Sequence, residues 1–222
     1  QQAMRLAPRY SYLPYNLGLV YQRLNRRNDA EAAYSKAIAI APDSGEPYNA
    51  LGSLKASTGK FSEAEQLYRQ ALAKNPALLA ASYNLGLLLS SRKDRLGEAI
   101  ALWRGNLQRD PQHLPSRLSL AAALDDSKAA IVEYQEILKI RPDYVAARLA
   151  LADLLVKTGD HQGAVTELRE ALKTEPRSST IHEKIGDVEK SRNRSAEAAE
   201  AYRRALELAP DSTTRKRIRK KQ

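Results

Sequence analysis

The chain has 222 residues with no cysteine, and its 36 lysines and arginines against 26 aspartates and glutamates give a formal net charge of +10. Without cysteine the chain has no disulfide, zinc–thiolate site or cysteine nucleophile, and this absence is compatible with any compartment. Apolar residues make up 43% of the chain. No apolar run approaches the ~18 residues of a membrane span, so we expect none.

A unit of 31 to 35 residues returns six times along the chain. Each copy contains a Leu or Ile followed by a small residue, an alanine nine to thirteen residues later, and a closing proline. Four residues after that alanine stands an aromatic residue, except in the fifth copy, which has Leu168. The second copy shows the pattern in full with Leu51-Gly52, Ala64, Tyr68 and Pro76. The copies cover residues 11–44, 45–78, 79–113, 114–144, 145–178 and 179–212.

Each copy predicts two helices joined by a tight turn. Gly59 and Gly159 stand at the predicted turns of two copies and Asn25 and Asn193 at two others, and these residue types tolerate a left-handed backbone. The closing proline ends the second helix, because proline lacks an N–H to continue the ladder. The small residue permits close helix crossing with the alanine facing it, and we expect the aromatic ring to fill the space between copies.

The third and fourth copies depart from the 34-residue length and the residue pattern of the others. The third has an extra residue in its turn at 90–96, and places Gly105-Asn106 where the other copies favour a small apolar residue. The fourth is three residues shorter, so Asp125, Asp126 and Ser127 must close the turn and cap the next helix, and Ile137 replaces a packing alanine. Two interpretations stay open: ordinary drift in a tolerant repeat, or a local change in superhelical pitch between residues 90 and 130.

This pattern resembles the tetratricopeptide repeat, a pair of antiparallel helices, over essentially the whole chain. The resemblance implies an all-α fold, a right-handed α-solenoid of six helix-turn-helix units across 11–212. Residues 1–10 look like the end of the second helix of a preceding repeat, and 213–222 like a basic tail or the start of a capping helix. We therefore expect a piece of a longer array or of a larger protein.

In proteins with these repeats, the first helix of each unit lines a concave wall where extended peptides commonly bind. The resemblance thus implies a peptide-binding groove, rich in tyrosine and leucine in its N-terminal half and charged, mostly acidic, in its C-terminal half. Tyrosine rings can cover a peptide's side chains while asparagine amides bond its backbone. The simpler alternative is that exposed helix positions vary freely. The candidate groove residues are Tyr12, Tyr15, Asn16, Leu19, Asn49, Tyr83, Asn84, Leu87, Leu118 and Asp153.

Two other kinds of site are excluded. The carboxylate clamp of chaperone-tail receptors needs lysine, arginine and asparagine at positions that here include Tyr15, Leu19 and Ala50, which cannot bind a carboxylate. No catalytic constellation is present, because the three histidines lie in different copies and are expected to be solvent-exposed. With no phosphate-binding loop or nucleophile elbow, we expect a non-enzymatic protein without cofactor or metal.

Six of the ten net positive charges belong to the last eight residues, 215–222. Nucleic-acid binding through this tail and the loop arginines is therefore a less favoured interpretation. The favoured one is a scaffold that binds a peptide or helical segment of a partner protein. Two alternatives remain, a substrate-recruiting arm of an enzyme whose catalytic domain lies elsewhere, and self-association through the terminal repeats.

Overall fold

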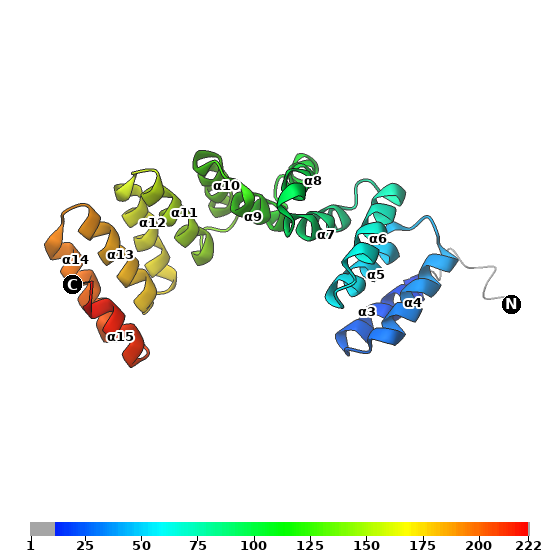
Figure 1. The fold of residues 1–222 in the computed structure, drawn as a ribbon, viewed down its shortest axis with the longest axis horizontal. Coiled ribbons are helices and arrows are strands. Elements are labelled where there is room, and N and C mark those ends of the chain that lie inside the picture. The colour runs from blue at the N-terminus through cyan, green and yellow to red at the C-terminus, as the bar shows by residue number, and fades with distance from the viewer. Residues whose placement is uncertain (1–11, 222) are drawn as a thin grey trace. The chain divides into compact units, whose positions relative to one another are not determined.

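The computed structural model describes residues 12–221, and within that range the chain consists of helices joined by short turns, without a β-strand (Figure 1). The predicted all-α class is confirmed, while the helix end expected at 1–10 lies outside the described residues. Six pairs of antiparallel helices follow one another and a further helix comes last. Their bounds are α3 (Tyr12–Arg23), α4 (Arg27–Ile40), α5 (Gly45–Ser57), α6 (Phe61–Lys74), α7 (Leu79–Ser90), α8 (Leu96–Arg109), α9 (Leu114–Ala123), α10 (Ser127–Ile140), α11 (Val145–Lys157), α12 (His161–Thr174), α13 (Ser179–Ser191), α14 (Ser195–Leu208) and α15 (Ser212–Arg219).

The described chain divides into two compact units, one ending at Ser116 and the other beginning at Arg117. In the first unit, α3 packs on α4, α5 on α6 and α7 on α8, and each pair also contacts the next pair. In the second unit the same arrangement joins α10 to α14, and α15 packs on α14. Within each unit, these helices therefore pack mainly against their sequence neighbours, as in a repeat protein.

The four predicted turn residues adopt the left-handed backbone. Their φ angles are 57° at Asn25, 78° at Gly59, 88° at Gly159 and 59° at Asn193. The extra residue of the third copy is absorbed by a short 3₁₀ turn, Lys93–Arg95, named η1. In the shortened fourth copy the carboxylate of Asp126 caps α10, as predicted, by accepting a hydrogen bond from the N–H of Lys128 at 2.9 Å.

The small residue of the repeat has a role that differs from the predicted one. A Cβ added to Gly52 would lie 2.8 Å from two ring atoms of Tyr68, whereas the nearest atom of Ala64 is its carbonyl oxygen at 3.4 Å. The glycine thus accommodates the aromatic ring of its own repeat more than the facing alanine. The ring also packs between copies, since Tyr34 lies in one cluster with Ala50, Leu51 and Leu54 of the next repeat.

The prediction that the histidines are solvent-exposed is wrong, since all three are half-buried. His113 Nδ1 lies 2.8 Å from Ser116 Oγ, and its ring meets Tyr83 edge-to-face. His161 Nδ1 lies 3.2 Å from Ser191 Oγ, and His182 lines a hollow formed by α12, α13 and α14. Each histidine is thus held by packing or hydrogen bonds within its own neighbourhood.

The irregular third copy buries a polar side chain. Asn106 takes the position that alanine occupies in four of the other copies, and it is fully buried. Its Nδ2 donates to the carbonyl oxygen of Leu79 and to Ser116 Oγ, both at 3.0 Å. Hydrogen bonds to both amide hydrogens explain how an asparagine is tolerated at an apolar position.

Candidate functional site

Helices α3, α5 and α7 carry eight of the ten predicted groove residues, all in the first unit. Tyr12, Asn16 and Leu87 are exposed, whereas the other five are half-buried: Tyr15, Leu19, Asn49, Tyr83 and Asn84. A half-buried side chain is held in position by its buried atoms, while its exposed atoms can contact a partner. We call these eight residues the tyrosine–asparagine surface.

At one end of this surface, Tyr15 is fixed by its neighbours. Its ring packs against that of Tyr34 with centroids 6.1 Å apart. Tyr12 and Tyr15 line a cavity of about 150 Å³ together with Glu46 and Pro47. Burial and the Glu46 carboxylate raise the pKa of Tyr15 above its usual 10.0, so its hydroxyl stays protonated and can donate a hydrogen bond at neutral pH.

In the middle of the surface, two asparagines from successive repeats contact each other. Asn84 Nδ2 donates to Asn49 Oδ1 at 2.9 Å and to Ser53 Oγ at 3.3 Å. Ser53 Oγ is in turn 3.3 Å from the hydroxyl of Tyr68. The sequence did not predict this contact, which fixes both amides and leaves Asn49 Nδ2 as a donor and Asn84 Oδ1 as an acceptor.

At the other end of this surface, the ring of Tyr83 packs edge-to-face against a histidine ring. The two rings, Tyr83 and His113, are 6.0 Å apart with an interplanar angle of 72°. Leu87, one helical turn further along α7, is 43% exposed. An aromatic ring with a neighbouring exposed aliphatic side chain is suited to cover a partner's apolar group.

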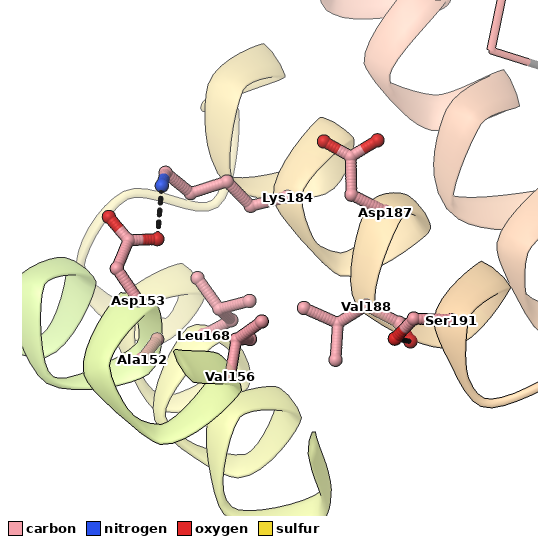
Figure 2. A pocket seen from close by; sticks show the side chains of 8 residues that line it. All are labelled: Ala152, Asp153, Val156, Leu168, Lys184, Asp187, Val188 and Ser191. Carbon is pink, nitrogen blue, oxygen red and sulfur yellow. Dashed lines mark hydrogen bonds and ion pairs between the residues drawn. The ribbon is translucent and has the colours of Figure 1, made fainter. Parts of the chain in front are cut away.

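The remaining two predicted residues belong to the second unit, Leu118 on α9 and Asp153 on α11. Leu118 is half-buried and does not line the cavity that Asp153 lines. This cavity, of about 200 Å³, lies between α11 and α13 (Figure 2). Figure 2 shows Val156 and Leu168 on one side facing Val188 on the other, with the Asp153–Lys184 ion pair at the rim. We call it the α11–α13 cavity.

The acidic side chains predicted for this part of the wall are paired within the chain. Glu183, which is only 5% exposed, binds Arg217 at 2.5 Å and Lys221 at 2.9 Å. Asp187 binds Lys221 at 2.7 Å and accepts a hydrogen bond from the hydroxyl of Tyr202 at 2.9 Å. Arg217 of helix α15 and Lys221, which follows that helix, thus neutralise acids that the sequence left open to a ligand.

Sequence reasoning missed the apolar lining of the α11–α13 cavity, Ala152, Val156, Leu168 and Val188. One signal was available, because Leu168 stands where the other five copies have an aromatic residue. Between residues 12 and 221, no group of three or more His, Asp or Glu residues is placed to hold a metal ion. No helix in this range is long and apolar enough to cross a membrane.

Comparison with known proteins agrees with this architecture. A family model described as a tetratricopeptide repeat matches residues 44–177, and two further models with that description match 10–77 and 149–213. Similar solved structures include pilF of Pseudomonas aeruginosa, with 19% identity, a TM-score of 0.76, and coverage of 97% of this chain and 99% of that one. Another is YrrB, titled a TPR protein with an unusual peptide-binding site, with 19% identity, a TM-score of 0.72 and coverage of 85% and 98%. A third is MamA, with 21% identity, a TM-score of 0.68 and coverage of 74% and 91%. The chain belongs to the tetratricopeptide repeat family.

Proposed function

We propose that this protein is a non-catalytic scaffold that binds an extended or helical segment of a partner protein on the first helices of its repeats. The observation that carries the proposal is the tyrosine–asparagine surface, where Asn84 and Asn49 are bonded to each other at 2.9 Å between two half-buried tyrosines. The tetratricopeptide fold supports a role in protein–protein interaction.

The asparagine pair is suited to a peptide backbone. Asn49 offers its Nδ2 as a donor and Asn84 its Oδ1 as an acceptor, which match the C=O and N–H of an extended peptide. Because each amide is held by the other, and Asn84 also by Ser53, little side-chain entropy is lost on binding. Tyr15 and Tyr83 would cover the peptide's side chains on either side.

The experiment compares Tyr15→Ala/Tyr83→Ala with the parent chain, using a partner recovered by pull-down with the whole chain. Loss of two aromatic anchors should weaken binding by at least ~2 kcal/mol in isothermal titration calorimetry while helicity is kept. Tyr144→Ala, which removes a half-buried tyrosine of the second unit, serves as the control and should bind like the parent. A double variant that binds as tightly as the parent would place the site elsewhere.

A second candidate function, self-association, has one observation in its favour. Helix α3 and the residue directly after it expose an apolar stripe at heptad-like spacing, with Leu13 63%, Leu17 46%, Val20 49% and Leu24 63% exposed. The stripe is symmetric about its midpoint, so two copies in antiparallel contact would pair Leu13 with Leu24 and Leu17 with Val20. Leu17→Gln/Val20→Gln should then lower the mass found by light scattering, whereas a parent that is monomeric at high concentration excludes this candidate.

A further inference from the structure

The α11–α13 cavity exists because the fifth repeat lacks an aromatic side chain. Tyr34, Tyr68, Trp103, Tyr134 and Tyr202 occupy the corresponding position of the other repeats, and Leu168 occupies it here. The leucine is itself 1% exposed, but it is too short to reach the edge of α11 as a tyrosine would. The space beyond its methyl groups is bounded by Val156 and Val188 and remains open (Figure 2).

Two other repeats have a tyrosine hydroxyl at the corresponding place. The residue after the small residue of the signature is Ser53 in the second repeat, Asp153 in the fifth and Asp187 in the sixth. In the second repeat the hydroxyl of Tyr68 lies 3.3 Å from Ser53 Oγ. In the sixth, the hydroxyl of Tyr202 donates to Asp187 Oδ1 at 2.9 Å. A phenol hydroxyl thus meets this position in both.

The sixth repeat is the closer template for the fifth. Asp187 accepts the phenol with Oδ1 and binds a lysine, Lys221, with Oδ2 at 2.7 Å. Asp153 likewise binds a lysine, Lys184, through Oδ1 at 2.5 Å. Within residues 12–221, no hydroxyl group donates to the Asp153 carboxylate. The fifth repeat therefore has a carboxylate paired with a lysine, as the sixth has, but not the tyrosine.

We infer that the α11–α13 cavity binds a tyrosine side chain of a partner protein, an inference that rests on the proposed scaffold function. The ring would contact Ala152, Val156 and Val188, and its hydroxyl would donate to the Asp153 carboxylate at the rim. The cavity volume of about 200 Å³ suits one side chain and is smaller than the ~300–1,000 Å³ of small-molecule sites. Since Lys184 already balances Asp153, a neutral phenol is favoured over a charged side chain.

Ala152, which lines the cavity, also bears on why a ring from a partner, rather than one from the repeat itself, would occupy the cavity. In the second repeat, glycine is required because a Cβ at position 52 would lie 2.8 Å from the ring of Tyr68. In the fifth repeat, Ala152 carries that Cβ. In the fourth repeat, Ala121 replaces the glycine, and Tyr134 is only half-buried, whereas Tyr34, Tyr68 and Tyr202 are buried. A ring entering between α11 and α13 can rest on the Ala152 methyl group without that constraint.

The test is a titration of the whole ¹⁵N-labelled chain, followed by NMR, with N-acetyl-tyrosinamide, N-acetyl-phenylalaninamide and N-acetyl-leucinamide as probes. The tyrosine probe should shift the amide signals of Ala152, Asp153 and Val188 saturably in the millimolar range. The phenylalanine probe should bind about tenfold more weakly, because it lacks the hydrogen bond to a carboxylate. Asp153→Ala changes an exposed residue and should leave the fold intact. In this variant the tyrosine probe should bind no more tightly than the phenylalanine probe.

A second variant fills the cavity from within. Ala152→Gly/Leu168→Tyr restores the glycine–tyrosine pair of the first, second and sixth repeats and should raise the melting temperature and abolish the shifts. Saturable binding of the tyrosine probe to a folded filled variant would overturn the inference, as would an equal response to the leucine probe or no response at the cavity. Because the probes are single amino-acid derivatives, these results do not depend on whether a partner uses Tyr15 and Tyr83.

Discussion

In the second repeat, the ring of Tyr68 occupies the space beside Gly52 where any side chain would stand. A Cβ at Gly52 would lie 2.8 Å from both Cδ1 and Cε1 of the ring, closer than van der Waals contact allows. The ring is almost fully buried, and its edge is fixed further by the hydroxyl–Ser53 contact. Glycine and aromatic ring therefore form one packing unit, although they stand on different helices.

Replacing this glycine should destabilise the first unit. Gly52→Ala forces the Tyr68 ring or helix α5 to move, and overpacking of this kind costs about 1–3 kcal/mol. Gly97→Ala is the matched control, because a Cβ at Gly97 in α8 would meet nothing within 4 Å. It should be neutral or stabilising by up to ~1 kcal/mol. Urea unfolding of both variants measures the difference, and equal effects would contradict the packing explanation.

A buried lysine gives the first unit a pH dependence. Lys55 Nζ lies 2.6 Å from Glu31 and 3.1 Å from Glu63, and its side chain is only 10% exposed. Hydrogen bonding to Glu31 raises the pKa of Lys55, and hydrogen bonding to Lys55 lowers the pKa of Glu63 below its usual 4.5. Because the pKa of Glu63 is lowered in the folded state, its contribution is present above pH 4.5 and lost as the pH falls through the lowered value.

Lys55→Met should therefore lower stability by about 1 kcal/mol near neutral pH, as expected for pairs with solvated partners. This difference from the parent should shrink in urea unfolding between neutral pH and about pH 3, because the Glu63–Lys55 pair weakens as the pH falls toward the lowered pKa of Glu63. Lys36→Met, which removes an exposed lysine of α4, should follow the parent at both pH values. A Lys55→Met deficit that stays constant down to pH 3 would show that packing, rather than charge, makes the difference.

The buried Asn106 and Ser116 should be energetically coupled. Asn106 Nδ2 donates to Ser116 Oγ at 3.0 Å, while Asn106 Oδ1 is buried without a hydrogen-bond partner. A double-mutant cycle with Asn106→Ala and Ser116→Ala should give a coupling energy of about 0.5–1.5 kcal/mol in thermal or urea unfolding. Strictly additive effects would mean that the hydrogen bond contributes nothing.

The cations within residues 216–221, in α15 and directly after it, should differ in their effect on stability. Arg217→Gln/Lys221→Gln leaves the buried carboxylate of Glu183 without a cation and should cost about 1–3 kcal/mol, below the value for a fully buried pair because both cations are partly solvated. Lys216→Gln/Lys220→Gln removes two exposed charges and should change stability by less than ~0.5 kcal/mol. Thermal unfolding compares the two double variants. Equal melting temperatures would contradict the conclusion that Arg217 and Lys221 stabilise the fold by pairing with Glu183.

The exposed cations Lys216, Arg219 and Lys220 also test nucleic-acid binding. Deleting 215–222 would remove Ile218 from a cluster with Ala198, Tyr202, Ala205 and Ala209, so point substitutions give a cleaner result. We expect Lys216→Gln/Arg219→Gln/Lys220→Gln to leave partner binding intact and only weakly salt-dependent. Binding to an arbitrary RNA in a gel shift that drops by orders of magnitude between ~50 and ~200 mM salt, and is lost in the variant, would favour the nucleic-acid interpretation instead.

The sequence by itself determined the helix pairs, their tight turns and the cap at Asp126. These features depend on interactions between residues a few positions apart, so they can be predicted from the residue type at each position. Glycine or asparagine indicates the left-handed turn, and aspartate indicates the cap. The repeat period added the order of packing, because each unit contacts mainly its neighbours.

Only the tertiary structure decided how side chains from different repeats meet. The Asn49–Asn84 bond joins residues 35 positions apart, and the Arg217–Glu183 pair joins residues 34 apart. Such contacts depend on the rotation and spacing of successive helices and on side-chain length, which no local pattern reports. The α11–α13 cavity likewise depends on the tertiary structure. The sequence shows at Leu168 that the fifth repeat lacks the aromatic ring. Whether neighbouring side chains fill the resulting space depends on how α11 and α13 pack.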